Sequence, residues 1–159
     1  MNTDIQQFIN LVHKVLAQSD NCADSNAMLD KCENYDQVRR FWEYYINGII
    51  NEVPEQVLQT FADYWNEYGD NLRKAGIYFN EDCAKWDLCI IGNTDKEVHL
   101  RYRCKAYVLG KATVVAHDRA QVFSFCDDAH IILKDSSFGN IRKGTYEKYN
   151  FATVIEGEN

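Results

Sequence analysis

The sequence contains a single proline and no pair of cysteines at C-x-x-C spacing. One proline argues against long linkers, so we expect 159 residues to form one domain or two small lobes that share a core. A chain of this length buries enough surface to fold without a metal or disulfide. Zinc sites usually draw ligands from close cysteine pairs, so we expect the six cysteines to be thiols, with no metal site and no cofactor.

Long apolar runs are also missing. No stretch approaches the roughly 18 apolar residues of a membrane-spanning helix. The first residues lack the basic start and the continuous apolar run of a secretory signal. We therefore expect a cytoplasmic protein that makes no membrane contact, in which a reducing environment keeps the cysteines as thiols.

Several motifs that carry familiar chemistry are absent. The sequence has no G-x-x-x-x-G-K-[ST], no G-x-G-x-x-G, no H-E-x-x-H and no G-x-S-x-G. An enzyme is not excluded by these absences, but they leave no reaction to name and no catalytic residue to predict.

Acidic side chains outnumber basic ones, and the excess lies in the first half of the chain. Residues 1–80 hold 12 Asp/Glu and 6 Lys/Arg, whereas residues 81–159 hold 12 and 11. A surplus of negative charge repels phosphate backbones and anionic lipids. This argues against direct nucleic-acid or membrane binding by the first half.

Apolar residues recur at helical spacing from the N-terminus to Gly76. The pattern predicts about four helices, with Thr3 or Asp4 as the first cap, and a last short turn. The first helix is expected to carry residues 5–16 and to end at 19–21, and the second is expected near 25–32. The third begins at Asn34 or Asp36 and runs to about 49, and the fourth follows Pro54 and runs to 68, with the turn at 71–74.

After Gly76 the apolar period changes to 2, which is typical of strands. Residues 97–108 alternate cleanly and predict one long strand. A small residue followed two positions later by Val or Ile then recurs, with starts 6, 8 and 9 residues apart. The units begin at Ala106, Ala112, Ala120, Ala129 and, after a gap, Ala152.

Short β segments of similar length suit a coil that stacks on itself, although a meander or sandwich also gives them. We predict an α+β fold. A helical lobe of residues 1–76 packs on a β-solenoid-like or β-meander half of residues 77–159, and the two form one compact unit.

The segment AYVLGKATVVAHDRAQVFSFCDDAHIILKD resembles the degenerate Ala-x-Val repeats of small β-solenoid proteins, many of them encoded by bacteria, phages or mobile elements. The resemblance covers about residues 97–137 and implies architecture rather than activity. Residues 138–151 break the phase of the repeat, and the helical half resembles no family.

Two charged groups are candidate binding surfaces. His99, Arg101, Arg103 and Lys105 alternate along the predicted long strand, so they would form a basic strip for an anion, a phosphate backbone or an acidic partner. A solvated outer face is the alternative. The second group is an acidic face in the helical half, which would dock a basic protein such as a nucleic-acid-binding one or simply confer solubility. It comprises Glu43, Glu52, Glu55, Asp63, Glu67 and Asp70.

Aromatic and histidine side chains give weaker signals. Tyr44 and Tyr68 fall at the edge of the apolar phase and are candidate anchors for a partner. His117 and His130 lie in neighbouring repeat units, where two imidazoles could meet across coils for a metal or proton-transfer role. Ordinary surface histidines are the alternative.

Three functional hypotheses follow. The leading one is a non-enzymatic protein–protein interaction module, encoded by a phage or mobile element, that inhibits or modulates a host system such as nucleic-acid-targeting defence through its acidic face. The runner-up is a β-helix acyltransferase of the hexapeptide-repeat type, for which Leu109–Thr113 supplies most of one hexapeptide and a histidine the base. The third is a structural subunit whose last coil, near Ala152–Ile155, stacks on another chain. The sequence does not fix the oligomeric state.

Overall fold

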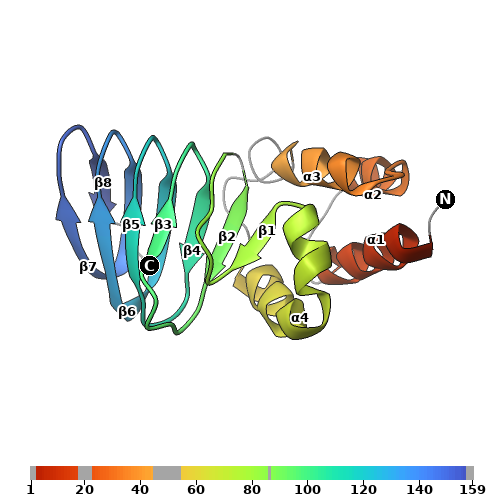
Figure 1. Ribbon diagram of the computed structural model, residues 1–159, viewed down its shortest axis with the longest axis horizontal. Helices are drawn as coiled ribbons and strands as arrows, with labels where there is room; N and C mark the ends of the chain where they lie inside the picture. Colours follow the sequence, from red (N-terminus) through yellow and green to blue (C-terminus); the bar gives the residue numbers. More distant parts are fainter. Residues whose placement is uncertain (1–2, 18–22, 45–54, 86, 157–159) are drawn as a thin grey trace. The chain divides into compact units, whose positions relative to one another are not determined.

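The computed structural model of the protein describes residues 3–17, 23–44, 55–85 and 87–156. Helices come first along these residues and β-strands follow (Figure 1). The chain divides into two compact units, Met1–Gly76 and Ile77–Asn159. Helices followed by a parallel β-solenoid confirm the predicted α+β class.

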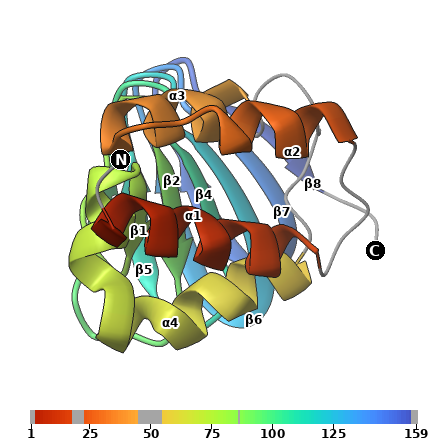
Figure 2. The ribbon, with the colours of Figure 1, turned by 90° about the vertical axis from the view of Figure 1, so that its right-hand side faces the viewer.

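The first unit is built from helices with one apolar face each. α1 lies between the α2–α3 pair and α4 (Figure 2). Phe8, Trp42 and Phe61 are among the largest side chains that this arrangement buries. The helices are α1 (Thr3–Leu16), α2 (Ala23–Asp30), α3 (Tyr35–Tyr44) and α4 (Glu55–Lys74).

The last helix differs from its prediction. A separate turn was expected at residues 71–74, but α4 runs on to Lys74 with a kink at Tyr68, where φ is −118° and ψ is 19°. The change in the apolar pattern near Tyr68 therefore marks a kink rather than a helix end. The predicted extension of the third helix over residues 45–49 lies outside the described residues.

A partly exposed hydrogen-bond network joins three helices of this unit. The Tyr35 hydroxyl at the start of α3 donates to Asp4 of α1. Asn71 Nδ2 of α4 donates to the Tyr35 oxygen at 2.6 Å. Burial, followed by the hydrogen bond to Asp4, raises the pKa of Tyr35 to about 12.

Replacing Tyr35 with phenylalanine should weaken the helical unit and change its alkaline behaviour. Loss of the hydroxyl leaves Asn71 and Asp4 without a shared partner, which costs about 1 kcal/mol. Because the folded pKa lies above the ordinary value near 10, the protonated phenol adds stability below pH 10. That stability is lost as the pH rises through the folded pKa.

Urea unfolding of both proteins at several pH values up to about 11.5 measures this effect. The parent should lose stability above pH 10 more steeply than Tyr35→Phe. Equal slopes in the two proteins would show that the network does not hold the phenol protonated.

The second unit is a coil of parallel strands (Figure 1). One stack runs in the order β1, β2, β4, β6, β7, β8, and a second runs β3, β5, β6, β7. β6 and β7 belong to both stacks because each is long enough to pass from one side of the coil to the other. The strands are β1 (Ile77–Phe79), β2 (Leu88–Ile91), β3 (Val98–Leu100), β4 (Lys105–Val108), β5 (Thr113–Ala116), β6 (Gln121–Leu133), β7 (Phe138–Lys148) and β8 (Thr153–Glu156).

The structural repeat is one full coil of 15 to 17 residues. It is given by the partners Cys89, Ala106, Val122, Gly139 and Val154, which pair in succession. The spacing of 6 to 9 residues between the Ala-x-Val units is therefore shorter than one coil. The buried interior consists of small and branched apolar side chains, with Ala106, Ala112, Ala120 and Ala129 among them.

Five cysteines in the described residues are free thiols, and Cys22 lies outside these residues. Cys83, Cys89 and Cys104 are buried in the interior of the solenoid. A hydrogen bond with Cys83, together with burial, raises the pKa of the Cys104 thiol. A buried thiol of this kind is a poor nucleophile.

None of the described helices combines the length and apolar character needed to cross a membrane.

Candidate binding ridge on the stacked turns

One edge of the solenoid is a column of stacked tight turns. Each is closed by a backbone hydrogen bond from its fourth N–H to its first carbonyl, at 2.9 to 3.4 Å. The turns are Arg101–Cys104, His117–Ala120, Lys134–Ser137 and Tyr149–Ala152. Both central residues of the first three have positive φ values between 48° and 65°. This is the type I′ geometry that suits a tight reversal between strands.

Backbone hydrogen bonds also hold successive turns in register. The N–H of Arg103 donates to the carbonyl of Asp118 at 3.2 Å, and that of Arg119 donates to Asp135 at 3.4 Å. Equivalent positions of neighbouring turns therefore lie side by side, one coil apart. We call this column of turns the turn ridge.

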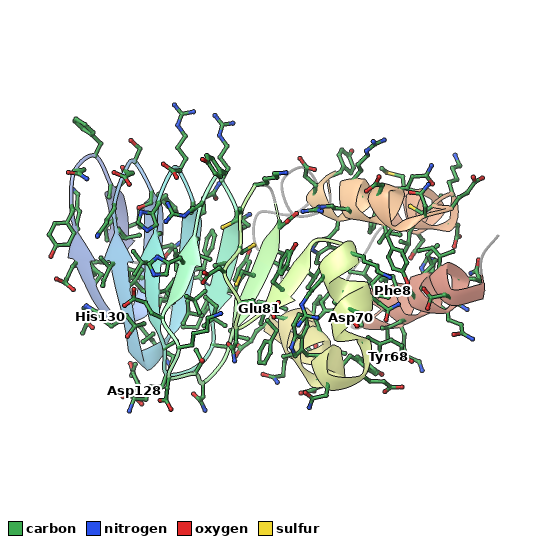
Figure 3. The ribbon with its side chains drawn as sticks, in the orientation of Figure 1. Phe8, Tyr68, Asp70, Glu81, Asp128 and His130 are labelled. Atoms are coloured by element: carbon green, nitrogen blue, oxygen red, sulfur yellow. The ribbon has the colours of Figure 1, made fainter. Side chains whose placement is uncertain are left out.

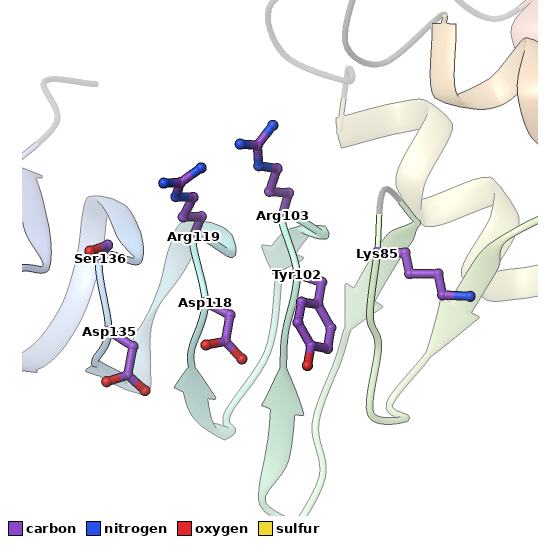
Figure 4. Close-up of a pocket in the computed structure, with 7 residues that line it drawn as sticks. All are labelled: Lys85, Tyr102, Arg103, Asp118, Arg119, Asp135 and Ser136. Carbon is purple, nitrogen blue, oxygen red and sulfur yellow. The ribbon is translucent and has the colours of Figure 1, made fainter.

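A depression of about 720 Å³ lies along the turn ridge (Figure 4). Arg103 and Arg119 occupy the same position in neighbouring turns, and their side chains point the same way. Tyr102, Asp118 and Asp135 point to the other side of the ridge. Among the described residues, the lining consists of Lys85, Tyr102, Arg103, Asp118, Arg119, Asp135 and Ser136.

The two carboxylates in the depression have partners of their own. Asp118 Oδ2 lies 3.9 Å from Nη1 of Arg101. Asp135 Oδ2 lies 3.4 Å from Nδ1 of His117. Within the described part of the chain, no carboxylate forms an ion pair with Arg119. Arg119 therefore contributes positive charge to this side of the ridge.

A line of polar side chains crosses the coils beside the ridge. Glu97 Oε1 lies 2.8 Å from His99 Nε2, and His99 Nδ1 lies 3.4 Å from His117 Nε2. The two imidazoles stack with centroids 5.6 Å apart and 13° between their planes. Asp135 then continues the line from His117. Among the described residues, no cluster of His, Cys, Asp and Glu has the geometry to hold a metal ion.

The pairing of His117 with His130, which the sequence left open beside ordinary surface positions, does not occur. His130 Nδ1 lies 2.7 Å from Thr145 Oγ1, and His130 Nε2 lies 2.7 Å from Glu147. The hydrogen bond to His130 lowers the pKa of Glu147. His130 projects from β6 (Figure 3), where it pairs in register with Thr145 rather than with the turn that holds His117. The sequence suggested His117 and His130 as neighbours because the spacing between Ala-x-Val units was taken as the length of one coil.

The prediction that the four residues of the basic strip lie along one strand is also wrong. A single strand was expected from 97 to 108, but residues Arg101–Cys104 form a turn between β3 and β4. His99 lies on β3, and Lys105 is buried on β4 with its Nζ 5.4 Å from the Phe123 ring centroid. Arg101 and Arg103 are exposed on the turn ridge.

The sequence prediction missed Arg119 and Lys85 because it considered only the basic residues of one predicted strand. The spacing of Arg119 from Arg103 equals one coil, and this is the signal that would have found it.

The predicted acidic face is only partly continuous. Its residues on α4 are exposed, but the kink at Tyr68 separates Asp70 from the others (Figure 3). Asp70 also forms an ion pair with Arg73 at 2.7 Å, so its charge is locally offset. Glu43 is half-buried, Glu55, Asp63, Glu67 and Asp70 are exposed, and Glu52 lies outside the described residues.

The two tyrosines proposed as anchors differ. The Tyr44 side chain is 52% exposed, so it is available to a partner. Tyr68 is half-buried and packs edge-on against Tyr64, with ring centroids 5.9 Å apart. Its pKa is raised, mainly by the charge of Glu67. Tyr68 therefore packs within α4 and offers a partner less exposed area than Tyr44.

Comparison with known proteins identifies no family. No family model and no solved structure matches the chain. A segment is similar to the bud site selection protein RAX2 of Saccharomyces cerevisiae, with 34% identity over 100 residues. The match covers 57% of this chain but 8% of the yeast protein. A similarity of this extent leaves the function to be argued from the residues of the site.

Proposed function

We propose that the protein is a non-enzymatic protein–protein interaction module that binds its partner through the turn ridge. The supporting observation is the depression of about 720 Å³ lined by Arg103, Arg119 and Tyr102 on a scaffold of hydrogen-bonded coils. Arg and aromatic side chains dominate the energetically important contacts of protein interfaces. Because the hydrogen-bonded coils already order the backbone of the turns, binding does not have to order a flexible loop.

Two aromatic side chains extend this surface. Tyr102 is 60% exposed in the depression, and Phe151 is 85% exposed in the last turn of the ridge. Large apolar side chains with this exposure gain buried area when a partner covers them. The ridge thus offers both apolar and positively charged contacts.

The proposal extends to the biological setting. The resemblance of the repeat region to phage- and mobile-element-encoded solenoids supports a modulator or inhibitor of a host system, acting in the cytosol. The exposed carboxylates Glu55, Asp63 and Glu67 would add a second contact with a basic, nucleic-acid-binding partner.

Affinity capture with a matched pair of variants tests the proposed function. The double variant Arg103→Glu and Arg119→Glu should retain at least about tenfold less partner than the parent, since it replaces attraction by repulsion. The control is Lys111→Glu with Lys143→Glu, which makes the same change in net charge on exposed residues outside the ridge.

Circular dichroism should show that both variants are folded. Equal capture by the ridge variant and the parent would contradict the proposal, and so would a parent that retains no protein at all.

A further inference from the structure

The two arginines of the turn ridge form a pair with a defined spacing. Arg103 and Arg119 are the third residues of consecutive turns. The backbone N–H of each donates to a backbone carbonyl of the next turn along the ridge. Neighbouring parallel strands, and hence neighbouring coils, are about 4.8 Å apart. Their guanidinium groups extend from the same side of the ridge (Figure 4). A single small anion can therefore contact both groups.

The third position of the next turn carries a neutral donor. Ser136 is exposed there and also lines the depression. Three consecutive coils thus present two guanidinium groups and a hydroxyl in one row. The carboxylates of the depression lie on the other side of the ridge and are held by Arg101 and His117.

This row fits a phosphoryl group better than a carboxylate. A carboxylate has two oxygens and one charge, which a single guanidinium satisfies through two parallel hydrogen bonds. A phosphate monoester has three terminal oxygens and a charge near −2 at neutral pH. Two guanidinium groups balance that charge, and a hydroxyl on the next coil completes the set of donors.

We propose that the turn ridge recognises a phosphorylated segment of the partner protein, with Arg103 and Arg119 on the phosphoryl oxygens and Ser136 as an additional donor. This inference rests on the proposed function and specifies the chemistry of the partner. Tyr102 also lines the depression, but its side chain points to the opposite side of the ridge from the two arginines, so it would contact a different part of the partner. The exposed site makes each contact weak by itself, so the affinity depends on both arginines acting together.

Side-chain NMR of the intact, ¹⁵N-labelled chain tests the phosphoryl site directly. O-phospho-L-serine and inorganic phosphate should shift the Nε–H resonances of Arg103 and Arg119, while L-glutamate at the same concentration should shift them much less. Arg119→Gln should weaken phosphoserine binding by about tenfold, because one of two charge-assisted contacts is lost. Arg103→Gln with Arg119→Gln should abolish binding, and Lys111→Gln should leave it unchanged.

The inference is overturned if glutamate and phosphoserine give the same response, or if the double variant still binds phosphoserine. A second measurement separates it from the proposed function. Phosphatase treatment of the lysate should remove capture of the partner by the parent protein. Capture that survives phosphatase but is lost in Arg103→Glu with Arg119→Glu would refute the phosphoryl site while keeping the ridge as the interface.

Discussion

Replacing Gly144 with alanine should destabilise the solenoid by about 3 kcal/mol, because both the backbone angle and the space at this position require glycine. Gly144 has a φ of +99°, which L-residues rarely adopt. A Cβ atom there would lie 2.7 Å from the carbonyl oxygen of Ala129 and 2.8 Å from that of Cys126. Both neighbours are backbone atoms of β6, so a side-chain rotation cannot relieve the clash.

Gly69→Ala is the matched control for this substitution. Gly69 lies in α4, and the nearest atoms to its added Cβ are 3.6 to 3.8 Å away. Alanine in a helix is favoured over glycine by about 0.5–1 kcal/mol, so this variant should be as stable as the parent or more stable. Urea unfolding followed by circular dichroism measures both free energies. A Gly144→Ala protein with the stability of the parent would show that the coil does not close as tightly as the structure has it.

Gly144 also shows why residues 138–151 were thought to break the repeat. This segment contains no Ala-x-Val unit, yet β7 pairs with β6 along both of its halves. Gly139 is in register with Val122, so a glycine stands where the preceding coil has the branched residue of its Ala-x-Val unit. A Cβ atom at Gly139 would lie 2.7 Å from Leu133, so this position is tightly packed. A pattern defined by Ala-x-Val therefore misses this coil.

The general architecture could be predicted because periodicity reports burial directly. The first helix was expected to carry the apolar residues from Ile5 to Leu16, and α1 (Thr3–Leu16) does so, because its apolar face is regular over its whole length. The change of period after Gly76 falls where the two compact units meet in the chain. The prediction of a solenoid followed from small and branched residues recurring at short intervals, and these residues do fill its interior.

The candidate site could not be predicted in the same way, because its first turn lacks the usual signals. Tyr102 and Arg103 take positive φ values of 52° and 63° in a turn with no glycine, proline or asparagine. Alternation across 97–108 therefore predicted a strand where the chain reverses direction. The proximity of Arg103 and Arg119 depends on the coil length, which only the strand register supplies.

Replacing Trp42 with alanine should have the largest effect on the helical unit. Trp42 is 2% exposed on α3, and its ring meets that of Phe61 on α4 edge-on at 5.2 Å and 84°. Removing a buried Trp side chain costs about 3–5 kcal/mol, from lost apolar burial and from the cavity that remains. Tyr44→Ala is the control on the same helix, since its side chain is 52% exposed and its loss should change stability by no more than about 0.5 kcal/mol. Denaturant titration of the three proteins measures the difference, and comparable losses for Trp42→Ala and Tyr44→Ala would contradict the packing of α3 against α4. Tyr44 is the one predicted anchor with a largely exposed ring. If Tyr44→Ala keeps the stability of the parent but captures less partner, then the helical unit contacts the partner through this side chain.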